Sequence, residues 1–243
     1  MKRRHRTEAL RWLATTLTAL ALFRLWPGLD LGVSAAAFDV DGPRHFPFGE
    51  AAPVQWLYLV VPWMGRCALL AALVLVWRSG TPPRWRRRAQ ALLLVLVLGL
   101  WGVVNVGLKD HWGRPRPTEV SAFGGPHPFQ PAGRISACCD TNCAFVSGHA
   151  ATGFTLMAVG LLGAPAARRR WWHIGLVAGL VIGTGRVLQG GHFLSDIVFA
   201  GLAMQGVCLL VRAGWVRWRL RRRRARAPDK DAGQRGCPHN RPA

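Results

Sequence analysis

Acidic residues are scarce in this sequence, which has 11 Asp and Glu against 32 Lys and Arg and a formal net charge of +21. No cluster of carboxylates accompanies its most polar motifs, so we expect no site for Mg²⁺ or Ca²⁺, which prefer oxygen ligands. No internal repeat is evident either, and 243 residues are enough for one domain. We therefore expect neither a metal nor another cofactor, and a chemistry that relies on cationic side chains.

Hydrophobic residues make up 51% of the chain despite its high charge, a combination that is rare in soluble proteins. A nucleic-acid-binding protein would explain the charge, but its apolar content would be lower and its basic residues would share a face with aromatic residues. Here the arginines form short blocks between long apolar runs. This separation predicts an all-α membrane protein with basic loops on one side of the bilayer and no nucleic-acid partner.

Six apolar segments predict six transmembrane helices in a bundle. They cover residues 10–26, 56–77, 91–108, 150–167, 171–188 and 193–211. Arg66 lies midway along the second segment, where a cation should pair or face a cavity. The first segment could also be a signal peptide, but Ala35 to Ala37 lie too far beyond it for a cleavage site. We expect an uncleaved anchor.

The connections between the segments alternate in charge, and Lys and Arg are biased to the cytoplasmic side of membranes. The N-terminus, the second and fourth connections and the tail are strongly basic, whereas the first outer connection has four acidic residues against Arg44. These charges predict cytoplasmic termini. Residues 1–214 then form the membrane domain, and residues 215–243 form a basic cytoplasmic tail that we expect to be disordered.

Three polar clusters stand at segment ends assigned to the outer side, namely Lys109–Pro117, Ser147–His149 and Gly185–Asp196. Polar groups are costly inside a bilayer, so their convergence on one face indicates a functional site. Guanidinium and ammonium groups can neutralise a phosphoryl dianion, and arginine does so with paired donors. The content of the clusters therefore favours a phosphate ligand.

His192 and Asp196 are four residues apart, so on a helix they share a face. A carboxylate so placed can hold an imidazole in one tautomer and leave its other nitrogen free to attack phosphorus. His149 would then protonate the departing oxygen. Ser147 and the backbone around Gly148 would add neutral donors to the phosphate.

The clusters resemble the three motifs of the type 2 phosphatidic acid phosphatase family, which shares its core with vanadium-dependent haloperoxidases. The matching residues are Lys109, Arg116 and Pro117 in the first motif, Ser147, Gly148 and His149 in the second, and Arg186, His192 and Asp196 in the third. Val146 replaces a proline of the second motif, and Gly185 replaces a serine of the third. Both departures spare the charged and nucleophilic positions.

This resemblance covers about residues 90–210 and implies a metal-independent phosphatase with a phosphohistidine intermediate on His192. It implies that His149 protonates the leaving group. It also implies that phosphate is bound by Lys109, Arg116, Ser147, Gly148 and Arg186. Arg114, which lies inside the first motif but outside its fixed positions, is a candidate auxiliary contact.

A site at the membrane–water boundary suits a lipid phosphate, and residues 142–148 (NCAFVSG) resemble the subgroup that includes lipid A phosphatases. We expect a bacterial inner-membrane enzyme that acts on lipid A at the periplasmic face. Undecaprenyl diphosphate and phosphatidylglycerol phosphate are the alternative substrates. A lipid-phosphate transporter would not need both histidines and Asp196, and an intramembrane serine protease using Ser147 would leave the cations without a role.

Three cysteines, Cys138, Cys139 and Cys143, crowd the outer loop, where an oxidising compartment permits a disulfide. We expect Cys143 to pair with Cys138 or Cys139. Zinc bound with the help of His127 is the alternative, although the spacing matches no standard zinc site.

Overall fold

A computed structural model describes residues 2–42 and 45–225 of the chain. Within these ranges the structure is helical, and the only β-type pairing is an isolated bridge between Val120 and His127. The predicted all-α fold is therefore confirmed for the described residues.

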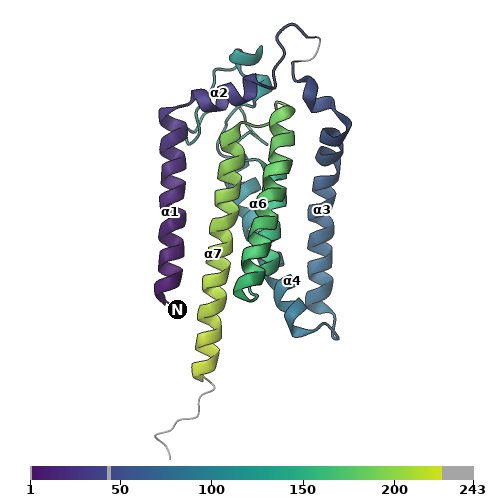
Figure 1. Ribbon diagram of the computed structural model, residues 1–243, viewed down its shortest axis with the longest axis vertical. Coiled ribbons are helices and arrows are strands. Elements are labelled where there is room, and N and C mark those ends of the chain that lie inside the picture. The colour runs from purple at the N-terminus through teal and green to yellow at the C-terminus, as the bar shows by residue number, and fades with distance from the viewer. Residues whose placement is uncertain (1, 43–44, 226–243) are drawn as a thin grey trace, which may run out of the picture.

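Five long helical stretches form the body of the molecule. They are α1 (Lys2–Leu25), α3 (Ala52–Trp77), α4 (Pro83–Val95) continued by the π-helix η2 (Leu96–Lys109), α6 (Pro165–Leu188) and α7 (Leu194–Ala225). In Figure 1, α1, α7, α6 and α3 stand upright, and α2 (Gly28–Ala35) lies across one end. The remaining elements are short, namely η1 (Pro47–Glu50), η3 (Pro117–Glu119), η4 (Ser121–Phe123), α5 (Gly148–Phe154) and η5 (Thr155–Gly160).

Four stretches within the described residues are long and apolar enough to cross a membrane. They are Ala52–Trp77, Pro83–Lys109, Pro165–Leu188 and Leu194–Arg222. Large hydrophobic side chains such as Trp56, Leu59 and Leu210 are exposed on their surfaces, as lipid-facing residues would be. The chain is a membrane protein by these criteria.

The fourth predicted segment, residues 150–167, is shorter than expected. The helical run of α5 and η5 ends at Gly160, and the chain turns before Pro165 starts α6. Proline suits the first turn of a helix because its missing N–H would have no partner there. Arg168 to Arg170 consequently belong to the first turns of α6 and not to a loop.

Close backbone contact fixes α5 against α6. A Cβ atom at Gly153 would lie 2.8 Å from the Cα of Gly179, so the helices approach at a distance that only glycine permits. Phe154, 1% exposed, fills the space beside this contact in the main hydrophobic core. The packing holds the start of α5, with its predicted site residues, next to the end of α6.

The start of α1 and the end of α7 lie at the same end of the bundle, and the loops between η2 and α5 lie at the opposite end with α2 (Figure 1). α7 runs past residue 214 to Ala225, so the first part of the predicted tail is helical. The rest of the predicted disordered tail, residues 226–243, lies outside the described residues.

Candidate active site

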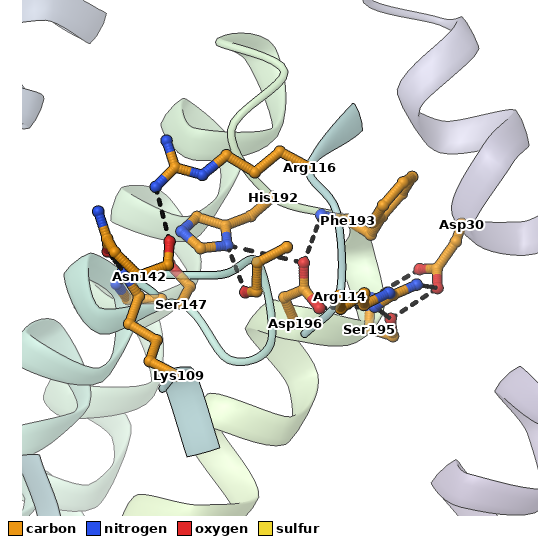
Figure 2. A network of polar contacts seen from close by, with 12 residues as sticks. Asp30, Lys109, Arg114, Arg116, Asn142, Ser147, His192, Phe193, Ser195 and Asp196 are labelled. Carbon is orange, nitrogen blue, oxygen red and sulfur yellow. Dashed lines mark hydrogen bonds and ion pairs between the residues drawn. The ribbon is translucent and has the colours of Figure 1, made fainter. Parts of the chain in front are cut away.

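The three predicted clusters meet at the end of the bundle covered by α2. Lys109 ends η2, Ser147 precedes α5, Arg186 lies in the last turn of α6, and His192 is in the turn before α7. Figure 2 shows Lys109, Arg116, Ser147 and Asp196 around the imidazole of His192. The structure thus brings together residues that are far apart in the sequence.

The imidazole of His192 is 1% exposed and is oriented by two acceptors on one of its nitrogens. Its Nδ1 lies 2.8 Å from the carbonyl oxygen of Ala144 and 3.6 Å from Oδ2 of Asp196. A proton on Nδ1 donates to these oxygens, which leaves Nε2 as a lone-pair nitrogen facing Arg116 and Asn142 (Figure 2). The backbone carbonyl of Ala144 is therefore the nearer partner of Nδ1, and the carboxylate of Asp196 is the more distant one.

Burial also keeps this imidazole neutral. It lowers the pKa of His192 to about 4, although the hydrogen bond and charge of Asp196 oppose the shift. A neutral imidazole with one free nitrogen has the state that a nucleophile at neutral pH requires.

Arg114 is fully buried, and all three of its guanidinium nitrogens donate to protein groups. Nη1 lies 2.6 Å from Asp196 and 2.7 Å from Ser195, Nη2 lies 2.8 Å from Asp30, and Nε lies 2.9 Å from the carbonyl oxygen of Gln130. Figure 2 shows this network on the far side of Asp196 from His192. Arg114 therefore reaches His192 only through Asp196.

Asp30 joins α2 to the start of α7. Its carboxylate accepts from the amide and the hydroxyl of Ser195 at 2.8 and 2.6 Å, besides its ion pair with Arg114. Burial raises the pKa of Asp30, and the positive charge of Arg114 opposes that effect. Asp196, in the first turn of α7, similarly accepts from the amide of Phe193 at 2.8 Å, so it satisfies a free N–H at the start of this helix while it faces His192.

Asn142 holds the two cations of the first motif. Its side-chain oxygen accepts from Lys109, and its backbone oxygen accepts from Nη2 of Arg116 at 2.8 Å. Asn142 has a φ of 53°, a left-handed conformation that asparagine tolerates better than most residues. It lies inside the loop closed by the Cys139–Cys143 disulfide, while Cys138 is a free thiol.

Tyr58 contacts two further site residues, Arg186 and His149. The guanidinium of Arg186 lies 4.8 Å from the centre of the Tyr58 ring, and the ring of His149 stacks on it at 5.1 Å. Nε2 of His149 is 3.2 Å from the carbonyl oxygen of Tyr58, and Arg186 donates to the side chain of Gln189. α3 thus positions the candidate acid beside a candidate phosphate ligand.

Gly191, Ser147 and Gly148 complete the site. A Cβ at Gly191 would lie 2.3 Å from Nη2 of Arg186, so glycine makes room for the guanidinium beside the His192 turn. Ser147 is buried and accepts from the amide of Ala150 at 3.4 Å, which makes it the N-cap of α5. Gly148 lies close to Lys109, whose Cε would be 3.9 Å from an added Cβ.

Sequence reasoning missed Asp30, Tyr58, Asn142, Gln189 and Ser195. One signal was available for Asp30, because it is an acidic residue in an otherwise apolar stretch after the first segment. Asn142 begins the segment 142–148, and Ser195 precedes Asp196. Their partners are distant in the sequence, so no local pattern identifies the contacts that they make. Tyr58 is the single tyrosine of the chain, and composition alone gives it no role.

Comparisons with known proteins identify the family of the chain. The sequence model of a family described as the PAP2 superfamily matches residues 90–222. A lipid A 4′-phosphatase of Francisella tularensis subsp. novicida is 43% identical over 196 residues, which cover 76% of this chain and 85% of that protein. Lipid A 4′-phosphatases of Rhizobium leguminosarum and Rhizobium etli are 34% and 32% identical, and 76% of this chain aligns with 86% and 78% of those proteins. No solved structure matches the chain.

Proposed function

This chain belongs to the PAP2 superfamily, and we propose that it is a lipid A 4′-phosphatase that works through a phosphohistidine intermediate on His192. Its family and relatives make it a membrane lipid phosphatase. The observation that carries the proposed mechanism is the geometry of His192. Its Nδ1 faces Ala144 and Asp196, while its Nε2 faces Arg116 and Asn142.

The proposed reaction has two displacement steps. Lys109, Arg116 and Arg186 neutralise the charge of the bound phosphate, and the Nε2 lone pair of His192 attacks phosphorus. The bond between phosphorus and the sugar oxygen breaks, and His149 gives that oxygen a proton. When the substrate binds, its negative phosphate lies beside His149 and favours the protonated form of this histidine.

Water completes the cycle in the second step. His149, now neutral, removes a proton from a water molecule, whose oxygen attacks the phosphorus of phosphohistidine. The bond between phosphorus and Nε2 breaks, inorganic phosphate leaves, and His192 is again neutral. Asp196 stabilises the positive imidazole ring while it carries the phosphoryl group.

A groove next to the site supports a lipid substrate. It has a volume of about 740 Å³ and begins at Lys109, Gly148 and His149. From there it runs between α3 and the α4–η2 helix, with mostly apolar walls that include Leu69 and Leu100. A molecule with a phosphate at one end and acyl chains at the other fits this distribution of polar and apolar lining.

The same proposal includes a bundle of six spanning segments with the site at the periplasmic face of a bacterial inner membrane. α1 and the α5–η5 run would be the two segments beyond the four strongly apolar ones. The basic residues near the ends of α4, α6 and α7 opposite the site support this orientation.

The test is phosphate release by purified protein in detergent from lipid A, undecaprenyl diphosphate and phosphatidylglycerol phosphate. We expect release from lipid A with loss of the 4′-phosphate, observed by mass spectrometry, and no effect of a chelator. His192→Ala should reduce kcat by at least about 10³-fold because it removes the nucleophile. His173→Ala, which changes an exposed histidine of α6, is the matched control.

Each arm has an outcome that rejects part of the proposal. Equal release by His192→Ala and His173→Ala would reject the phosphohistidine mechanism. Inhibition by the chelator would reject a metal-independent reaction. Release only from one of the other two lipids would reject lipid A as the substrate while retaining the phosphatase.

A further inference from the structure

The fourth segment is too short to fill the bundle along its whole height. The α5 and η5 helices run from Gly148 to Gly160, and such a run rises about 22 Å. The hydrocarbon core of a bilayer is about 30 Å thick. Because α5 begins at the active site, the shortfall lies at the opposite end of the molecule.

A cavity of about 660 Å³ occupies the place below this short segment, between α1, η5, α6 and α7. Its apolar lining includes Met157, Leu161, Trp172 and Leu209. Leu161 and Pro165 mark the turn between η5 and α6, so the cavity begins where the fourth segment stops. The cavity therefore adjoins the end of the short segment.

Four arginines from three helices line the same cavity. They are Arg11 of α1, Arg168 and Arg169 of α6, and Arg212 of α7. Among the described lining residues Glu8 is the only carboxylate, and it lies 2.7 Å from Nη1 of Arg212. Four positive charges against one negative charge favour an anionic occupant.

α1 contacts the bundle through α7, and the cavity lies beside this contact. Nε1 of Trp12 donates to the carbonyl oxygen of Leu202 at 2.8 Å, and Glu8 pairs with Arg212. A Cβ at Gly206 would lie 2.6 Å from the Trp12 ring, so the two helices approach closely at this point. The gap between α1 and α6 is left for another molecule to fill.

We propose that this cavity binds one anionic glycerophospholipid, with its phosphate at Arg11 and Arg169 and its acyl chains along the apolar lining. A basic pocket between transmembrane helices is the arrangement that recognises such headgroups. Free phosphate could pair with the guanidinium groups, but it would leave the apolar side chains of the cavity without a contact. None of the residues proposed to bind or attack the phosphate in the active site lies in the described lining, so the lipid proposed here is distinct from the substrate of that site.

The occupant would join α1 to α6 and complete the bundle where the fourth segment is missing. In the proposed orientation the cavity opens to the cytoplasmic leaflet, on the side opposite the lipid A site. The inference does not require phosphatase activity, because it rests on the cavity and its charges alone. Its failure is therefore distinct from a failure of the proposed function.

The experiment uses the full chain, delipidated in an uncharged detergent, with dioleoyl phosphatidylglycerol, dioleoyl phosphatidylcholine or inorganic phosphate added. Bound lipid is counted by native mass spectrometry, and Tm is measured in parallel. We expect phosphatidylglycerol to be retained and to raise Tm, because a ligand that binds only the folded state stabilises it. Phosphatidylcholine and inorganic phosphate should have little effect.

Arg11→Gln/Arg169→Gln should reduce retention of phosphatidylglycerol at least about tenfold and remove most of the Tm shift, since the phosphate loses two charge-assisted partners. The matched control is Arg87→Gln/Arg217→Gln, which removes the same charge from exposed positions outside the cavity lining. It should behave as the wild type. Arg11→Lys/Arg169→Lys, with its charge unchanged, should retain part of the binding and serves if the Gln variant does not fold.

Three results would overturn the inference. Equal lipid retention by the Gln variant and its control would show that the cavity arginines do not bind the headgroup. Retention of phosphatidylcholine equal to that of phosphatidylglycerol would show that the negative charge of the lipid does not decide binding. A matching Tm shift with inorganic phosphate, competing with the lipid, would assign the cavity to a free anion.

Discussion

Arg114 lies at the centre of the buried network behind His192. It contacts two carboxylates, Asp30 and Asp196, and is 0% exposed. An ion pair buried in this way is strongly destabilised when one partner is removed, because the remaining charges lose their compensation. We infer that Arg114 positions Asp196 and does not touch the phosphate.

Arg114→Met should lower the free energy of unfolding by about 3 to 5 kcal/mol. Arg114→Lys keeps the charge but loses the planar fork, so kcat should fall while KM stays near the wild-type value. Thermal melts and steady-state kinetics check both expectations. Arg134→Met, at an exposed position of the same outer region, is the control. A raised KM with unchanged kcat would instead make Arg114 a phosphate contact.

The pH dependence of the reaction should report the low pKa of His192. The imidazole must be neutral to attack, and its pKa of about 4 places the acid limb of kcat/KM near pH 4 for the free enzyme. Asp196→Asn removes a charge that raises this pKa, so the limb should move to lower pH. An acid limb near pH 6.5 that does not move in Asp196→Asn would contradict this assignment.

The same shift makes stability depend on pH. The pKa of His192 is about 4 in the folded protein against 6.5 for an ordinary histidine. The unfolded chain therefore takes up a proton on His192 at a higher pH than the folded protein does. The free energy of unfolding keeps its full value above about pH 6.5 and decreases as the pH falls from there toward 4.

Whether a residue of the candidate site could be predicted depends on how far its partners lie from it in the sequence. The proximity of His192 and Asp196 was predictable because both belong to one short motif, although His192 lies in the turn before α7 and not on the helix itself. Asp30 and Asn142 were not, because their partners are brought to them by the fold. Arg114 was found as a site residue, but its burial, which decides its role, has no signature in a single sequence.

Among the elements, the loop closed by Cys139 and Cys143 positions both cations of the first motif through Asn142. Cys139→Ser/Cys143→Ser should free this loop and raise KM about tenfold, with kcat changed less than about twofold. Kinetics with and without dithiothreitol provide the measurement. Cys138→Ser, at a free thiol, should have no effect. A fall in kcat at constant KM would contradict a role in phosphate binding.

The groove beside α3 gives a role to Arg66, which lines it from the middle of α3, whereas Lys109 lies at the end of η2. Its guanidinium lies 4.8 Å from the Trp63 ring, and a cation at this depth is costly unless it meets polar groups of a ligand. Arg66→Met should therefore raise KM for lipid A severalfold and leave KM for a soluble phosphate ester unchanged. An equal change for both substrates would exclude a contact with the lipid portion.

The helices themselves were partly predictable. Apolar length identified the cores of α3, α6 and α7, but the end of the fourth segment at Gly160 was not recognised. Residues 150–167 include no charged residue, and hydropathy does not show that Gly160 and Gly163 allow a turn before Pro165. A Cβ at Gly160 would lie 2.6 Å from the carbonyl oxygen of Ala167, so tertiary packing decides where this helix ends.

For the whole molecule, the distribution of charge and the fold lead to the same orientation. Arginines gather near the start of α4, the start of α6 and the end of α7, all at the end opposite the site. Asp39, Asp41 and Glu50 lie in the connection at the site end. Lys and Arg near spanning segments favour the cytoplasm, so the site should face the periplasm.

A green fluorescent protein fused to the C-terminus should therefore fluoresce in bacterial cells, because this reporter folds in the cytoplasm and not after export through the general secretory route. An epitope inserted after Asp41 should bind antibody in intact spheroplasts without permeabilisation. The two labels test opposite ends of one bundle, so they must report opposite sides. If the epitope required permeabilisation, the site would face the cytoplasm, and a periplasmic lipid phosphate could not be its substrate.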